Sequence, residues 1–492
     1  MKRTAPFHFG PPSAMATRHR RHRAYGQQPK QDLTTGAIFP KLLRFCIPLI
    51  LSGMLQLLYN ATDMIVLGQF VSDTAVGAVG SCASLINLIV NSFIGLATGV
   101  SVCVAQFIGA RREKDVSEVV HTAFSLSLMI GVAVGAIGFL LAEPALRLMG
   151  VLETTLVEAV PYMKAYMIGV PGLVVYNYCA AALRAKGDSV RPLIFLAISG
   201  LSNVMLNLWM VLDFGMGAVG VGIASAASQY IAAILVITYM MFFIKDSCRL
   251  SLRQMGIKRD KVLLILKIGI PAGVQGVLFS FSNVLIQSSI QSFGTEALVN
   301  GSAAASNVEG FVYTAQNAAY QGAITFVGQH VGAHKYERIN RVITSCLGLT
   351  VAAGVLFGAI VLIFGESLLG FFVDDPTAIE YGMLRMSVIV STYFLCGIME
   401  VGCGTLRGMG KTFLPMIVSL AGACGFRILW LVTVFRQFYT PMCLFLSYPI
   451  SWILTLAVHF FFVFRVKRNM QREYAEQARG QEMPSETAVG SQ

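Results

Sequence analysis

Long apolar stretches alternate with short polar segments along the chain, and each apolar stretch is about 20 residues or longer. A helix of that length crosses the hydrocarbon core of a bilayer. The strands of a membrane β-barrel are shorter and alternate between apolar and polar positions, so the pattern favours helices. We predict an all-α membrane protein whose twelve transmembrane helices cover residues 38–66, 78–107, 117–141, 156–182, 192–212, 218–244, 262–291, 298–329, 338–364, 378–405, 413–434 and 441–466.

Composition supports this prediction and narrows the function. Only 13% of the 492 residues are charged and 55% are hydrophobic, whereas a soluble protein carries about 25% charged residues. The ten cysteines follow no spacing pattern, and most fall inside predicted helices as small packing residues. The sequence contains no phosphate-binding loop, nucleophile elbow, CxxC pair or metal-ligand cluster. We therefore predict neither an enzyme nor a bound cofactor, and an ATP-driven pump would need a partner that supplies the ATPase domain.

Basic residues are distributed unequally between the two sets of loops. Loops that follow even-numbered helices carry 17 lysines and arginines, and loops that follow odd-numbered helices carry two. Because cytoplasmic loops of membrane proteins are rich in Lys and Arg, we predict a multi-pass protein of the cell (inner) membrane with both termini in the cytoplasm. The net charge of +12 then requires no nucleic-acid partner.

The same features divide the chain into five parts. We predict a basic, disordered cytoplasmic tail over residues 1–36, a six-helix lobe over 37–244, a basic cytoplasmic linker over 245–261, a second lobe over 262–466 and a disordered tail over 467–492. The N-terminal tail has no apolar core that would suit a secretory signal peptide. The expected partners are the lipid bilayer and small organic molecules, and we expect a monomer.

The two lobes repeat one pattern at an offset of 223 residues. Pro48 corresponds to Pro271, and Gln106, Gly109 and Ala110 correspond to Gln329, Gly332 and Ala333; the same shift relates Leu183, Arg184, Gly187 and Pro192 to Leu406, Arg407, Gly410 and Pro415. Because each repeat holds an even number of helices, both repeats enter the membrane from the same side. Such parallel repeats suit two lobes that rock around a central cavity and expose it to each side in turn.

A carboxylate and several amides stand inside the first lobe. Gln56, Asn60 and Asp63 are spaced to share one helix face, and Asn203 and Asn207 share a face of the fifth predicted helix. An intramembrane Asp costs about 2.5–3.5 kcal/mol near a helix centre, which favours a functional role. The carboxylate with amide oxygens at Asp63, Asn203 and Asn207 is a candidate site for Na⁺, or Asp63 carries a proton. The alternatives are an Asp that caps or extends to the membrane interface, and amides that join helices.

The second lobe lacks this cluster, because the shift of 223 replaces Asp63 by Ile286, Asn203 by Phe426 and Asn207 by Trp430. In its place, the second lobe has Glu309 in the middle of its second predicted helix and Glu400 on its fourth. They are candidates for a substrate-attracting cavity or a second cation site, and the alternative is a buried ion pair with Arg427. Lys164 and Arg385, which lie near helix ends, are expected to extend to the membrane interface.

The landmarks also resemble those of the multidrug and toxic compound extrusion (MATE) family. The resemblance rests on Pro48 with Asp63 fifteen residues later, on the two Gln-x-x-Gly-Ala segments and on the two Leu-Arg-x-x-Gly segments, and it covers roughly residues 36–466. It implies an antiporter that admits cations and exports organic, often cationic, compounds. It also implies cation coupling at Asp63, with Gln56 and Asn177 at polar family positions. The chain departs from many relatives in having Asn207 where they have a second Asp, which weakens a two-carboxylate proton site.

Two other functions stay open at this point. A lipid-linked oligosaccharide or peptidoglycan-precursor flippase of the same superfamily is the alternative transporter, but it would need a cationic cavity. A channel or receptor fits less well with a duplicated fold whose candidate ion site is present in one copy only. We therefore predict H⁺- or Na⁺-coupled export of cationic amphipathic compounds.

Overall fold

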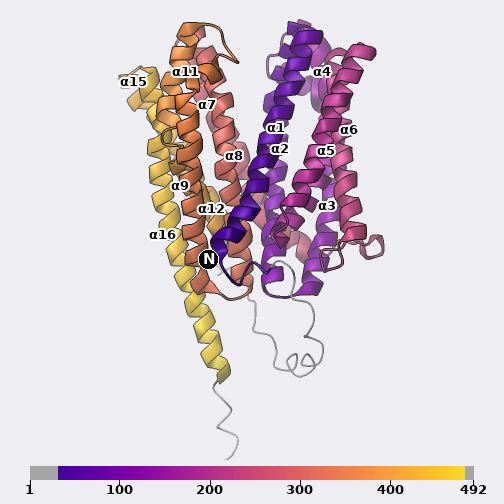
Figure 1. Ribbon diagram of the computed structural model, residues 1–492, viewed down its shortest axis with the longest axis vertical. Helices are drawn as coiled ribbons and strands as arrows, with labels where there is room; N and C mark the ends of the chain where they lie inside the picture. Colours follow the sequence, from indigo (N-terminus) through magenta and orange to yellow (C-terminus); the bar gives the residue numbers. More distant parts are fainter. Residues whose placement is uncertain (1–31, 483–492) are drawn as a thin grey trace, which may run out of the picture.

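A computed structural model describes residues 32–482, and all regular secondary structure in that range is helical. Figure 1 shows the helices standing side by side as two lobes. The first lobe comprises α1 (Ile38–Phe70), α2 (Asp73–Gly109), α3 (Glu113–Leu148), α4 (Glu153–Lys186), α5 (Val190–Leu208) and α6 (Gly217–Thr238). The second comprises α7 (Arg259–Gln291), α8 (Glu296–Gly332), α9 (Ile339–Ile363), α10 (Gly365–Leu369), α11 (Pro376–Ile389), α12 (Tyr393–Gly408), α13 (Phe413–Ser419), α14 (Phe426–Val432), α15 (Val434–Gln437) and α16 (Pro441–Glu482).

These elements make the twelve predicted membrane crossings. Ten helical segments of the described chain are long and apolar enough to cross a membrane, and α11 with α12 forms an eleventh that bends by 47°. The twelfth is α8, which is 37 residues long but less apolar. Helix α8 contacts α1, α2, α9, α11 and α12, so neighbouring helices rather than lipid cover most of its surface. The predicted all-α, twelve-helix fold is confirmed.

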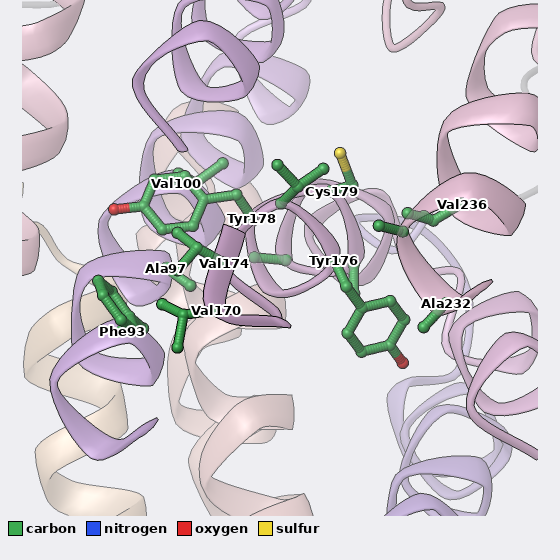
Figure 2. Packing of buried hydrophobic residues seen from close by; sticks show 14 of the residues in the cluster. Phe93, Ala97, Val100, Val170, Val174, Tyr176, Tyr178, Cys179, Ala232 and Val236 are labelled. Atoms are coloured by element: carbon green, nitrogen blue, oxygen red, sulfur yellow. The ribbon is translucent and has the colours of Figure 1, made fainter. Parts of the chain in front are cut away.

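Helix α4 forms the centre of the first lobe. It packs against α2, α3 and α6, and Figure 2 shows its Tyr178 beside Val100 of α2 and its Tyr176 beside Ala232 of α6. The hydroxyl of Tyr176 donates to the carbonyl of Pro192 at 3.0 Å. This buried core gives the first lobe a rigid body against which α1 and α5 are placed.

Helix α1 crosses from one lobe to the other along its length. Near its start, Leu42 and Phe45 lie in a hydrophobic cluster of the second lobe, where the Phe45 ring meets the Phe326 ring edge-on with centroids 5.8 Å apart. Near its end, Val66 and Leu67 lie in the core of the first lobe. The start of α1 therefore joins the lobes, and its end belongs to one lobe only.

Helix α7 makes the reciprocal crossing. Ile265 and Ile268 pack into the core of the first lobe, whereas Ile286 and Ile290 pack into a cluster of the second lobe. Both described chain ends lie at the end of the molecule where α1 and α7 begin (Figure 1). We call this the basic end because the arginine- and lysine-rich loops are there. The lobes meet at the basic end, and their helices separate towards the opposite end (Figure 1).

Two predicted boundaries need correction. Helix α16 continues to Glu482, so the prediction of a disordered tail is wrong for residues 467–482. Arg, Lys, Gln and Glu in this stretch favour helix, and the Tyr474 ring stacks on the His334 ring with centroids 4.7 Å apart.

The start of the described chain is also ordered, contrary to the predicted disorder of residues 1–36. The backbone N–H of Thr34 donates to the Asp32 carboxylate at 2.8 Å, and Lys335 donates to the Thr34 carbonyl at 3.0 Å. Burial opposes ionisation of Asp32, but the Thr34 hydrogen bonds and the Lys335 charge together hold the pKa of Asp32 below its ordinary value. The predictions for residues 1–31 and 483–492 lie outside the described residues.

Candidate cation site and its surroundings

A close approach between α1 and α5 brings the candidate carboxylate to its amide partners. Gly200 has no Cβ, and one built there would lie 1.8 Å from the ring of Tyr59. The Tyr59 hydroxyl donates to the Ala197 carbonyl at 3.4 Å. Because only Gly allows this contact, the sequence places α1 directly on α5, and Asp63 follows Tyr59 by about one helical turn.

Asp63 and two asparagines form a continuous hydrogen-bonded chain. The Asn207 amide donates to the Asp63 carboxylate and, at 3.3 Å, to the Asn203 side-chain oxygen. The Asn203 amide donates to Ser225 of α6 at 3.5 Å. Asn207 is fully buried and Asn203 is 5% exposed. The two polar faces identified in the sequence therefore meet, and α6 adds a hydroxyl that the sequence analysis did not include.

One oxygen of this cluster has no partner. The side-chain oxygen of Asn207 is buried and accepts no hydrogen bond from the described residues. An unsatisfied buried acceptor costs about 1–3 kcal/mol. A carboxylate, two amide oxygens and a hydroxyl in one place are oxygen ligands of the kind hard cations prefer. A π-helical turn, Trp209–Asp213, follows α5 directly, and such turns are frequent at functional sites.

Three other predicted residues lie outside this cluster. Gln56 and Asn60 are exposed, and neither makes a hydrogen bond with the Asp63 chain. Asn177 donates to the Leu173 carbonyl at 2.9 Å within its own helix. Their assignment to cation coupling stays a prediction.

Glu309 is held in a buried ion pair, as in the alternative considered above, but its partner is Arg385 rather than Arg427. Arg385 of α11 donates to its two oxygens at 2.8 and 2.9 Å, and the side chains are 8% and 6% exposed. The prediction that Arg385 extends to the interface is therefore wrong, because a bidentate carboxylate satisfies the guanidinium inside the lobe. Arg427 does not pair with Glu309; it donates to Ser451 at 3.1 Å and lies over the Tyr448 ring at 4.1 Å.

Glu400 of α12 has a different environment. It is 9% exposed, and no described residue donates a hydrogen bond to it or forms an ion pair with it. Arg407, on the same helix, donates instead to the Tyr320 hydroxyl and to Gln275. The alternative considered above, a Glu400–Arg427 ion pair, is not found in the described chain. The role of Glu400 in a substrate cavity or a second cation site stays a prediction.

The repeat landmarks meet at the basic end as two equivalent contacts. Gln106 of α2 donates to the carbonyl of Gly408 at 2.9 Å, and Gln329 of α8 donates to the carbonyl of Ala185 at 2.8 Å. Each bond joins one lobe to the other, and both donors and acceptors are related by the shift of 223. We call this pair the reciprocal glutamine bonds.

Glycines allow the close packing around these bonds. A Cβ on Gly109 would lie 2.0 Å from the Gln329 carbonyl oxygen, and one on Gly332 would lie 1.9 Å from the Gln106 carbonyl oxygen. The loops that follow repeat as well, since Arg111 and His334 share a left-handed conformation with φ of 56° and 57°. The Gln-x-x-Gly-Ala segments thus encode a backbone-to-backbone contact between lobes.

The comparison with known families agrees with the internal repeat. The sequence model of the MatE family matches the chain twice, over residues 48–209 and 271–433. The chain belongs to the MATE family of transporters. The two matched segments begin 223 residues apart, which is the offset that relates the two lobes.

Several curated proteins are similar to this MATE transporter over most of its length. A probable multidrug resistance protein of Bacillus subtilis is 24% identical over 405 residues, which cover 81% of this chain and 87% of that protein. A probable multidrug resistance protein of Thermotoga maritima is 27% identical, with 80% and 84% covered. An FAD transporter of Shewanella oneidensis is 22% identical, with 80% and 87% covered.

Solved structures share the fold at low sequence identity. The outward-facing conformation of a multidrug resistance MATE transporter superposes with a TM-score of 0.84 and 18% identity, covering 91% of this chain and all of that one. A MOP superfamily transporter from Pyrococcus furiosus gives a TM-score of 0.84 and 18% identity, covering 89% and 98%. This MATE transporter therefore has the same fold as these solved structures.

Two groups in this MATE transporter were missed in the sequence analysis. Ser225 lies in an apolar helix with Ser228 three residues later. This pair of hydroxyls was the sequence feature that could have indicated a polar contact from α6. The position of Arg385 near a helix end suggested that its side chain extends to the membrane interface. It is buried instead, because Glu309 of α8 pairs with it. Distant pairing of this kind leaves no local pattern.

Proposed function

We propose that this protein exports organic, cationic amphipathic compounds across the cell membrane in exchange for H⁺ or Na⁺. The observation that carries the proposal is the Asp63–Asn207–Asn203 chain, with an unpartnered oxygen on Asn207. A cation or proton that binds there neutralises Asp63 and changes which contacts the carboxylate makes. Relatives named as multidrug resistance proteins support export of such compounds.

Alternating access follows from how the lobes are joined. The excess of basic residues in the loops at the basic end supports a cytoplasmic location for that end and for both termini. Opening to the cytoplasm requires both reciprocal glutamine bonds to break, whereas opening to the outside leaves them intact. Ion binding at Asp63, near the opposite end of α1, would then bias the equilibrium between the two states.

One observation favours a second class of transported compound, namely one with an anionic group. Arg427 is buried and has no carboxylate at ion-pair distance among the described residues, so it can attract an anionic group. This feature suits the lipid-linked precursor flippase considered above. The pairing of Arg385 with Glu309 leaves fewer free cations in the second lobe, which favours the cationic substrates.

Reconstitution into proteoliposomes tests the proposal. Efflux of a cationic dye is measured with an imposed pH gradient alone and with an imposed Na⁺ gradient alone. We expect one gradient to drive dye transport and the other to have little effect. Equal transport with no gradient, or transport only of an anionic lipid-linked substrate, would refute cation-coupled export.

A further inference from the structure

An open pocket lies at the basic end between the starts of α1 and α9. Its volume is about 340 Å³. The first lobe contributes the N-terminal turn of α1, and the second contributes two arginines and two hydroxyls from the start of α9. The pocket is lined by Gly36, Ala37, Ile38, Phe39, Pro40, Arg338, Arg341, Thr344 and Ser345.

The polar part of this pocket is suited to an anion. Arg341 is exposed and forms no ion pair with a described residue. The Nε of Arg338 is buried and has no partner, although its terminal nitrogen donates to the Gly36 carbonyl. The residue before α1 is Ala37, which cannot cap the helix with its side chain. Two guanidinium groups beside an uncapped helix start attract a phosphate.

An apolar strip continues from the pocket along α1. Phe39, Leu43 and Ile47 are 47%, 37% and 47% exposed, and their spacing places them on one helix face. On α9, Val351 and Val355 are 38% and 58% exposed. A ligand that fills this place therefore needs an anionic head beside the arginines and apolar chains that follow the helices into the membrane.

We infer that the pocket binds the phosphate headgroup of an anionic phospholipid from the leaflet at the basic end. Basic pockets between transmembrane helices bind anionic lipid headgroups in this way. The chain segment before residue 32 is a poor alternative occupant, because its Arg18, Arg20, Arg21 and Arg23 would repel the pocket arginines. Since one wall belongs to α1 and the other to α9, the bound lipid stabilises the lobes in their joined arrangement.

Nanodiscs of defined composition test this inference with the full-length protein. Bound phosphatidylglycerol is counted by native mass spectrometry, and the unfolding temperature is measured in phosphatidylcholine with and without phosphatidylglycerol. Arg341→Gln removes a charge that forms no ion pair within residues 32–482, so the fold should be retained. Arg253→Gln is the matched control, because Arg253 is an exposed basic residue on the linker at the same end.

We expect phosphatidylglycerol to raise the unfolding temperature of the wild-type protein and of Arg253→Gln. In Arg341→Gln the affinity for phosphatidylglycerol should fall about fivefold, the effect of removing one basic residue near an anionic lipid surface. Equal binding by wild type and Arg341→Gln would overturn the inference, and so would equal losses in both variants. Stabilisation by millimolar inorganic phosphate in pure phosphatidylcholine would overturn the lipid assignment in favour of a free-phosphate site.

Discussion

At the basic end the two lobes present equivalent residues to each other. Gln106 bonds to Gly408 and Gln329 bonds to Ala185, with nearly equal distances and with glycines at equivalent positions. Near the opposite end of α1 the equivalence is lost, because Ile286 of the second lobe replaces Asp63. The duplicated fold has kept its symmetry where the lobes contact each other and lost it where a cation would bind.

This difference separates two physical roles. A contact between lobes is made by both partners, so a change on one side disturbs the complementary surface of the other. An ion site needs only one lobe to supply its ligands, and the second copy can become apolar. The second lobe uses its buried acids differently, since Glu309 is neutralised by Arg385 and Glu400 forms no ion pair with a described residue.

The largest effect is expected at Asp63. Asp63→Asn keeps the volume but removes the charge, and we expect gradient-driven efflux to fall about 100-fold, because a charged hydrogen-bonding ligand contributes roughly 3 kcal/mol. Efflux is measured in proteoliposomes at equal protein density, with the unfolding temperature recorded for each variant.

Glu366→Gln serves as the control, because Glu366 is an exposed acid in the first turn of α10 with no ion pair in the described chain. It should retain wild-type efflux. If a folded Asp63→Asn protein kept undiminished gradient-driven efflux, the coupling site could not be at Asp63 in the first lobe.

The fold could be predicted from the sequence to a large extent, for identifiable reasons. The apolar stretches predict the helices, and the repeat at an offset of 223 residues predicts the two lobes. Both features can be detected directly in the sequence. The meeting of Asp63 with Asn207 was anticipated, because the polar faces of the two helices were grouped as one candidate cation site. The cation-coupling role of these residues stays a prediction.

Side-chain partners between distant helices could not be predicted in the same way. Glu309 was considered as a partner of Arg427, yet Arg385 is its partner, because the choice depends on how α8 and α11 pack. The helix beyond residue 466 was missed because its hydropathy is low. Its polar residues favour a helix that lies outside the membrane. Tyr474 packs on His334, in a loop of the second lobe.

The second-largest effect concerns stability and compares the two acids of the second lobe. Glu309→Gln leaves Arg385 buried without a counter-charge, which should destabilise the protein by about 3–5 kcal/mol. Glu400→Gln breaks no ion pair, so it should change the unfolding temperature little while altering which dyes are exported. Unfolding temperature and dye profile are measured for both variants.

The double variant Glu309→Gln, Arg385→Gln provides the internal check, because it removes both charges and should recover part of the lost stability. Equal destabilisation by Glu309→Gln and Glu400→Gln would show that the ion pair is not what distinguishes them. Loss of ion dependence in Glu400→Gln with retention in Asp63→Asn would move the coupling site to the second lobe.

A smaller effect is expected at the reciprocal glutamine bonds, and it should be the same in both lobes. Gln106→Leu and Gln329→Leu each remove one neutral hydrogen bond, worth about 1 kcal/mol. The carbonyl that accepted that bond, of Gly408 or Ala185, then loses its side-chain donor. Each variant should raise cytoplasmic accessibility by a similar factor of about five. Labelling of a single cysteine introduced between the lobes measures this accessibility. Clearly unequal effects of the two variants would contradict the symmetry of the contact.

The smallest effect is expected at Gln56 and Asn60, which share a helix face with Asp63 but are exposed and outside its hydrogen-bonded chain. Replacing either by Ala removes an amide that water can replace, so efflux should change by less than about threefold, under 1 kcal/mol. Asn203→Ala is the matched comparison, because the same amide is lost from a position that is 5% exposed and bonded to Asn207. Asn203→Ala should weaken ion-dependent efflux more than Gln56→Ala or Asn60→Ala does. If Gln56→Ala or Asn60→Ala abolishes coupling while Asn203→Ala does not, the ion binds on the exposed face of α1, and the cluster with α5 serves to join the helices.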